Sequence, residues 1–157
     1  MNAFRPGVRL GIDVGSVRVG VARCDRDGLL AVPVETVPRG EGTIARILAL
    51  CEEHAPIELL VGLPLNLRGD DTPSTWDARE FAAELAHAQP LPVRLVDERL
   101  STVSAHSALR SSGRTQRQSR SMVDQVAAVV FLQQAIDTEK STGNPAGVVI
   151  EAPKEPS

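Results

Sequence analysis

Aromatic residues are scarce in this sequence of 157 residues, which has no tyrosine, three phenylalanines and one tryptophan. Proteins that bind single-stranded nucleic acid along a stacking groove use several aromatic rings. The scarcity therefore argues against such a groove and favours contact with the sugar-phosphate backbone, if nucleic acid is the ligand. Trp76 could still stack on a base, and the alternative is that it packs against the loop before it.

Other absences exclude further classes of protein. No apolar run approaches the ~20 residues needed to span a bilayer, and the first seven residues lack the apolar core of a signal peptide. The two cysteines, Cys24 and Cys51, match neither a metal-site spacing nor a redox pair. We therefore expect reduced, buried thiols in a cytoplasmic protein that has no membrane partner. The histidines have no metal-binding spacing, and nucleophile-elbow, Walker and Cys-x-x-Cys motifs are absent.

Positive charge is concentrated in one stretch, although the net charge of the chain is −3. From residue 99 to residue 123 there is no Asp or Glu, and the stretch contains Arg99, Arg110, Arg114, Arg117 and Arg120. These arginines could contact phosphates, and such binding should weaken steeply with salt. The alternative is a solvated helix-loop-helix face. Arg18, in the first hairpin, is a further candidate phosphate contact.

The apolar pattern predicts an α/β fold. Alternating apolar residues from residue 8 to residue 22, with a turn signal at Gly15 and Ser16, predict a hairpin. Three more strands are predicted over 29–37, 57–61 and 93–96, and helices over 43–53, from Pro73 or Ser74 onward, over 101–110 and over 118–136. Helical crossovers should make the two later strands parallel to the first. We expect a mixed five-stranded sheet of three antiparallel hairpin strands plus two parallel strands, flanked by helices.

This sheet and its helices form one expected domain over residues 1–137. Residues 138–157 are rich in Ser, Thr, Gly and Pro and are expected to be a flexible tail, in which 148–150 is a strand candidate.

Three acidic residues are candidates for one metal site. Asp13 and Glu98 end predicted parallel strands, where open α/β sheets bind their ligands, and Asp124 begins the last predicted helix. Carboxylates that hold two divalent ions can activate water and stabilise the leaving oxygen of a phosphodiester. Asp97 points opposite to Glu98 if the strand continues, so only one of them should enter the site. The alternatives are a turn residue for Asp13, a polar lead-in to a helix for Asp97 and Glu98, and a capping box with Ser121 for Asp124.

Four blocks of the sequence together resemble the YqgF family, also called RuvX, of the ribonuclease H-like superfamily. They are residues 11–22, 61–66 with Gly69, 96–103 and 123–129. The resemblance runs from about residue 8 to residue 137 and implies a ribonuclease H-like nuclease that uses Mg²⁺ or Mn²⁺. It also implies that Asp13, Glu98 and Asp124 are the metal-binding catalytic residues.

The family is described both as Holliday junction resolvases, by likeness to RuvC-type enzymes, and as nucleases that mature the 5′ end of 16S ribosomal RNA. The expected partner is therefore a structured RNA precursor or a branched DNA, and the sequence does not choose between them. A resolvase should be a homodimer because it cuts two strands symmetrically, whereas an RNA-processing enzyme could act as a monomer.

Two other functional classes are alternatives to a nuclease. Residues 11–16 also resemble the first phosphate loop of the actin, sugar-kinase and heat-shock ATPase group, but that group pairs two such domains. The sequence has no second Asp-x-Gly loop. The other alternative is a non-catalytic nucleic-acid-binding or ribosome-assembly factor, in which Asp13→Asn would leave RNA binding and cell growth intact.

Overall fold

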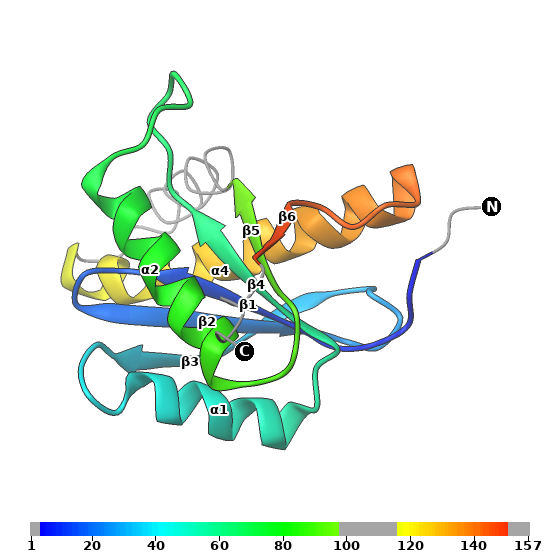
Figure 1. Ribbon diagram of the computed structural model, residues 1–157, viewed down its shortest axis with the longest axis horizontal. Coiled ribbons are helices and arrows are strands. Elements are labelled where there is room, and N and C mark those ends of the chain that lie inside the picture. The colour runs from blue at the N-terminus through cyan, green and yellow to red at the C-terminus, as the bar shows by residue number, and fades with distance from the viewer. Residues whose placement is uncertain (1–3, 98–115, 151–157) are drawn as a thin grey trace, which may run out of the picture.

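The computed structural model describes residues 4–97 and 116–150, and for residues 116–124 it describes the backbone alone. A mixed sheet lies between helices on its two faces (Figure 1). The strands are β1 (Arg9–Val14), β2 (Arg18–Cys24), β3 (Ala31–Pro38), β4 (Glu58–Leu63), β5 (Val93–Asp97) and β6 (Val148–Ile150). The helices are α1 (Thr43–His54), α2 (Pro73–Ala88) and α4 (Gln116–Thr142). The helix predicted over 101–110 lies outside the described residues.

The sheet has the order β3-β2-β1-β4-β5-β6. Hairpins make β1, β2 and β3 antiparallel, whereas β1, β4 and β5 are parallel because α1 and α2 return the chain to the starting edge. The prediction of five strands was wrong by one: the candidate at 148–150 is a strand, β6, antiparallel to β5. The part of the expected tail before residue 143 belongs to α4, and residues 151–157 lie outside the description.

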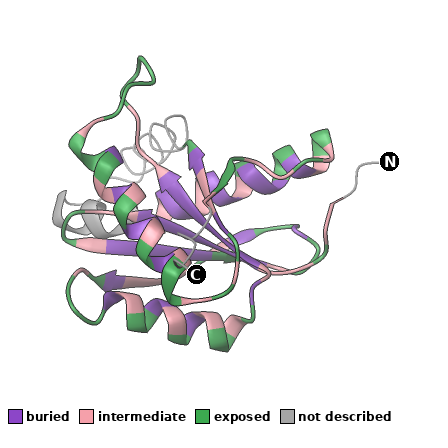
Figure 2. Cartoon of the chain, in the orientation of Figure 1, coloured by how far each residue is buried: buried purple, intermediate pink, exposed green. Residues whose placement is uncertain are grey.

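Each face of the sheet packs against its own hydrophobic core (Figure 2). On one face, Leu10 and other side chains of the strands pack with Phe81 of α2. On the other face, Leu60 and Val96 pack with Phe131 of α4. Strands buried on both faces have nearly continuous apolar sequences, which is why β4 could be predicted from a short apolar run.

The start of α2 is attached to the segment that leaves β4. Thr72 and Thr75 form a capping box, in which each side chain accepts the other's backbone N–H. Thr75 is fully buried, and its hydroxyl also donates to the carbonyl oxygen of Pro64. The first turn of α2 therefore has a fixed position relative to the end of β4.

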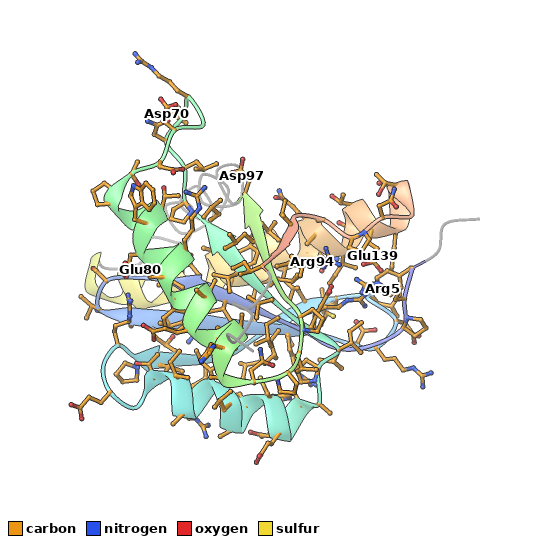
Figure 3. The ribbon with its side chains drawn as sticks, in the orientation of Figure 1. Arg5, Asp70, Glu80, Arg94, Asp97 and Glu139 are labelled. Atoms are coloured by element: carbon orange, nitrogen blue, oxygen red, sulfur yellow. The ribbon has the colours of Figure 1, made fainter. Side chains whose placement is uncertain are left out.

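A buried ionic cluster lies at the opposite edge, where the parallel strands begin. Arg5 Nη2 lies 2.6 Å from Glu139 and 2.9 Å from Glu58, and Arg9 Nη2 donates to Glu139 at 2.8 Å. Arg94 of β5 donates to Glu58 at 2.8 Å. Arg5, Arg94 and Glu139 lie close together in Figure 3. The cluster joins the N-terminal segment, three strands and the end of α4.

Both cysteines are free thiols, and the prediction that both are buried holds for Cys24 alone. Cys24 is buried and Cys51 is half-buried, and burial raises the pKa of both. Among the described helices, none has both the length and the apolar character needed to cross a membrane.

Candidate active site

Asp13 lies near the carboxyl end of β1, on the face of the sheet that α4 covers. Side chains alternate along a strand, so Asp13 shares a face with Gly11 and not with Ile12. Gly11 is in close contact with α4: a Cβ there would lie 3.0 Å from Cβ of Leu132 and 3.2 Å from the carbonyl oxygen of Ala128. Asp13 is only 8% exposed. It pairs with Gly20 inside the β1–β2 ladder, so the alternative of a turn residue is wrong.

A row of paired residues connects Asp13 to the start of the described part of α4. Asp13 pairs with Gly20 of β2, and Gly20 pairs with Thr36 of β3. Gln125 of α4 donates a hydrogen bond from its side-chain amide to the hydroxyl of Thr36. Because a helix rises only 1.5 Å per residue, Asp124 lies at nearly the same level along the sheet as Gln125 and hence as Asp13.

Asp124 occupies a different position in its helix from the one predicted. α4 begins at Gln116, so Asp124 lies within the helix and Ser121 is not its N-terminal cap. The capping-box alternative for Asp124 is therefore wrong. The side chain of Asp124 lies outside the description.

The carboxyl ends of β4 and β5 lie at the same edge as Asp13. Continuing the register of β1 and β4 by one residue sets Gly62 beside Asp13, and Gly62 pairs with Val96. Val96 packs in the core beneath α4, so strand alternation turns exposed Asp97, at the tip of β5, toward the other face (Figure 3). Glu98 follows Asp97 directly and lies outside the described residues.

Asp13 is the one predicted metal ligand whose side chain the structure describes. A carboxylate that is nearly buried at the ligand-binding edge of the sheet has the chemistry that Mg²⁺ prefers, an anionic oxygen donor. Among the described side chains, no group of three His, Cys, Asp or Glu could hold a metal ion. The other two predicted ligands, Glu98 and Asp124, are not among those side chains.

The turn that follows Asp13 is held by Arg39, a residue that was not predicted. Arg39 Nη1 donates to the carbonyl oxygen of Gly15 at 2.9 Å, and the guanidinium binds both carboxylate oxygens of Asp77 on α2, at 2.8 and 2.7 Å. The backbone N–H of Arg39 also donates to Val17. The hydrogen bond from Arg39 lowers the pKa of Asp77. No periodicity relates two residues 38 positions apart, so the sequence carried no signal for this pair.

Comparison with known proteins identifies the family of this chain. A family model described as "RuvX: Holliday junction resolvase" matches residues 7–138. The chain belongs to the RuvX family. A relative from Clavibacter michiganensis subsp. michiganensis, named "Putative pre-16S rRNA nuclease", is 55% identical over 150 residues, which cover 94% of this chain and 93% of the relative. A relative of the same name from Nocardioides sp. is 52% identical over 154 residues, covering 94% of this chain and 99% of the relative.

Solved structures resemble the fold of this RuvX chain. The structure titled "T. thermophilus RuvC in complex with Holliday junction substrate" matches with a TM-score of 0.51 and 20% identity, covering 88% of this chain and 98% of that one. At this identity the likeness shows the fold alone, and it confirms the predicted ribonuclease H-like architecture.

Of the six arginines predicted to contact phosphates in this RuvX chain, only Arg18 has a described side chain. Arg18 is the half-exposed first residue of β2, and its carbonyl accepts the N–H of Gly15 at 3.0 Å. Arg117 and Arg120 lie in the first turns of α4, on the N-terminal side of Asp124. The remaining three, Arg99, Arg110 and Arg114, lie outside the described residues.

Trp76 lies in the first turn of α2 and is 60% exposed, so most of its side chain is open to solvent. The guanidinium carbon of Arg79 lies 5.7 Å from the centre of its ring. Arg79 also forms a salt bridge with Asp71, in the loop before α2. The tryptophan is thus an exposed aromatic side chain with one cation beside it.

Proposed function

We propose that this RuvX-family protein is a metal-dependent endonuclease that hydrolyses nucleic-acid phosphodiesters, and that its reaction is the maturation of the 5′ end of the 16S ribosomal RNA precursor. The observation that carries the proposal is the register of the sheet. Asp13 and residue 124 of α4 have about the same position along the strand direction. Both lie toward the edge of the sheet where β5 ends, and Glu98 is the next residue in the sequence after β5. The names of relatives more than half identical to this chain favour RNA as the substrate.

Asp13, Glu98 and Asp124 would hold Mg²⁺ or Mn²⁺ through their carboxylate oxygens. When bound, such ions lower the pKa of a water molecule and stabilise charge on the leaving oxygen. The near-complete burial of Asp13 limits the access of bulk water to its carboxylate. Arg39 holds the turn after Asp13 against α2, so that the end of β1 keeps its place. The arginines between residues 99 and 123 would offset the charge of the substrate backbone.

A Holliday junction resolvase is the second candidate function. The description of the matching family and the RuvC-like fold favour it. This function would require two active sites in one assembly, because a junction is resolved by symmetrical cuts in two strands. A homodimer is therefore part of this second proposal and not of the first.

The test compares the purified protein, with Mg²⁺ or with EDTA, on a ribosomal RNA precursor and on a four-way DNA junction. We expect magnesium-dependent cleavage of the RNA. Asp13→Asn and Glu98→Gln should each lower the cleavage rate by more than about 100-fold, because even residues that only support metal ligands contribute about 10–100-fold. Cleavage of the junction alone would instead assign the resolvase function.

Asp97→Asn is the matched control, since Asp97 directly precedes Glu98 in the sequence and its side chain points to the face of the sheet opposite α4. This variant should cut at close to the wild-type rate. The nuclease proposal is overturned if neither substrate is cut, or if the Asp13 and Glu98 variants are folded and cut as fast as the wild type. Circular dichroism of each variant separates loss of folding from loss of chemistry.

A further inference from the structure

We propose that Trp76 is a stacking platform for one unpaired base of the nucleic-acid substrate, at the same edge of the sheet as Asp13. The proposal rests on the nuclease function and adds a base contact that the three acids cannot make. Its starting point is the exposure of the ring. Among the four aromatic side chains of the sequence, Phe81 and Phe131 are 3% and 0% exposed, and Phe4 packs against the core under α4, whereas Trp76 is 60% exposed.

Both sequence neighbours of Trp76 are bound to segments that leave the strands of the site. Thr75 donates to the carbonyl oxygen of Pro64, which directly follows β4. Asp77 binds Arg39, and Arg39 in turn binds the carbonyl oxygen of Gly15 in the turn after β1. The ring is therefore held at the carboxyl edge of the sheet by connections to two different strands, and a strand of substrate that crosses this edge would meet it.

The charges around the ring favour a base over a phosphate. Arg79, whose guanidinium carbon lies 5.7 Å from the ring centre, already pairs with Asp71, and exposed acids on the same loop and helix include Asp70 and Glu80 (Figure 3). Carboxylates repel phosphates, whereas stacking on an indole ring depends on the face of the base and tolerates nearby acids. A base must be unpaired and unstacked on one side to reach such a ring.

One platform agrees with the scarcity of aromatic residues. A stacking groove needs a series of rings, and this chain has a single exposed one. The platform would position one nucleotide.

The fluorescence of the protein tests this directly. Trp76 is the only tryptophan and there is no tyrosine, so the tryptophan emission of the wild-type protein comes from this one side chain. In EDTA, which prevents cleavage, a single-stranded RNA oligonucleotide should quench the emission with a saturable curve, and a blunt duplex should not. Trp76→Ala should weaken binding of the labelled oligonucleotide by about 10-fold, and Trp76→Phe should restore most of it, as expected for the loss and return of one stacked base.

Leu29→Ala is the control for loss of an exposed apolar side chain. Leu29 is 73% exposed and lies in the β2–β3 connection, at the opposite edge of the sheet from Trp76. Its replacement should not change oligonucleotide affinity. In cleavage assays with Mg²⁺, Trp76→Ala should raise KM with little change in kcat.

Two outcomes overturn the inference about Trp76. One is wild-type emission that saturating oligonucleotide does not change, and the other is a folded Trp76→Ala variant that binds the oligonucleotide as tightly as wild type. Either outcome, together with intact magnesium-dependent cleavage, leaves the nuclease function standing. Quenching without cleavage of any substrate would contradict the nuclease function and retain the base contact. In the second outcome, loss of binding of the Trp76→Ala variant to ribosomal particles would assign the ring to a protein partner.

Discussion

Strand β1 carries a buried charged residue near each end, and the two have different surroundings. Arg9, at the start, is 2% exposed and donates to Glu139 at 2.8 Å, which compensates its charge within the protein. Asp13, near the other end, is 8% exposed and faces α4 at the edge where parallel strands bind ligands. Under the proposed function, Asp13 is the residue of β1 that would hold the metal ion, through its carboxylate oxygens.

Arg39 should matter more than its partner Asp77, because Arg39 alone also binds Gly15. Arg39→Ala removes three side-chain hydrogen bonds, and Asp77→Ala removes two of them. We expect Asp77→Ala to lower the free energy of unfolding by about 1 kcal/mol, since the pair is partly exposed. Arg39→Ala should cost about 1 kcal/mol more and should also lower kcat for cleavage.

Urea unfolding of both single variants and of the double variant measures this coupling. The double variant should be no less stable than Arg39→Ala, because the shared interaction is already lost. Additive losses, or a folded Arg39→Ala variant with normal kcat, would show that this residue does not position the turn.

At the scale of elements, α4 links both edges of the sheet. Near the C-terminal end of α4, Glu139 binds Arg9. Toward the N-terminal end, Gln125 binds Thr36, which is connected to Asp13 through the paired residue Gly20. Between these contacts the helix lies directly on Gly11. A shift of α4 would therefore move position 124 relative to Asp13.

Gly11→Ala tests this packing. The added Cβ would lie 3.0 Å from Leu132 Cβ and 3.2 Å from the carbonyl oxygen of Ala128, so the helix would have to move by a few tenths of an ångström. We expect a loss of about 1–3 kcal/mol in the free energy of unfolding, as for other overpacked cores, and slower cleavage. Gly40→Ala is the control because a Cβ at Gly40 would meet no atom within 4 Å. Equal stability of the two variants would contradict the close contact.

At the scale of the whole molecule, the two edges of the sheet have separate roles. The edge where the parallel strands begin is closed by the ionic cluster of Arg5, Arg9, Glu58, Arg94 and Glu139. The other edge carries Asp13, the turn held by Arg39, and Trp76. Substitutions in the cluster should therefore act first on stability, and they should change the chemistry at the far edge only where they shift α4.

Glu139→Gln should show the stabilising role of the ionic cluster through the pH dependence of unfolding. Burial alone would raise the pKa of Glu139, but the hydrogen bonds and charges of Arg5 and Arg9 outweigh burial and lower it below its ordinary value of 4.5. The stabilisation from ionised Glu139 is thus complete above about pH 4.5 and is lost as the pH falls through the lower pKa of the folded state. At pH 7 the variant should be less stable by about 3 kcal/mol, because Arg9 loses a buried partner.

The measurement is urea unfolding of wild type and variant at pH 7 and below pH 4. The difference in stability should shrink at the acidic pH. Glu35→Gln serves as control, since its pKa is lowered by a solvent-exposed pair with Arg46, and its effect should be much smaller. A difference that stays constant with pH would contradict this role of Glu139.

Local patterns in the sequence determined most of the fold. The turn signal at Gly15 and Ser16 predicted the first hairpin, and the continuous apolar run near Leu60 predicted a parallel strand buried on both faces. The hairpin depends on residues that are close together in the sequence. The buried strand depends on its own apolar side chains, which are more stable away from water. The motif blocks likewise identified the family before any fold was known, because a family's residue types are a property of the sequence.

Tertiary structure decided the features that depend on distant partners. The three-residue strand β6 is too short to form without the edge of β5, and it is entered through Gly147, whose positive φ of 78° and contact with the backbone of Leu95 require glycine. The Arg39–Asp77 pair likewise arises only when α2 packs beside the segment that follows β3. Asp13 could be singled out from the sequence alone. Asp13 and residue 124 have similar positions along the strand direction only because α4 packs on Gly11 and crosses the sheet. The energies of such contacts depend on distances between residues that the order of amino acids does not reveal.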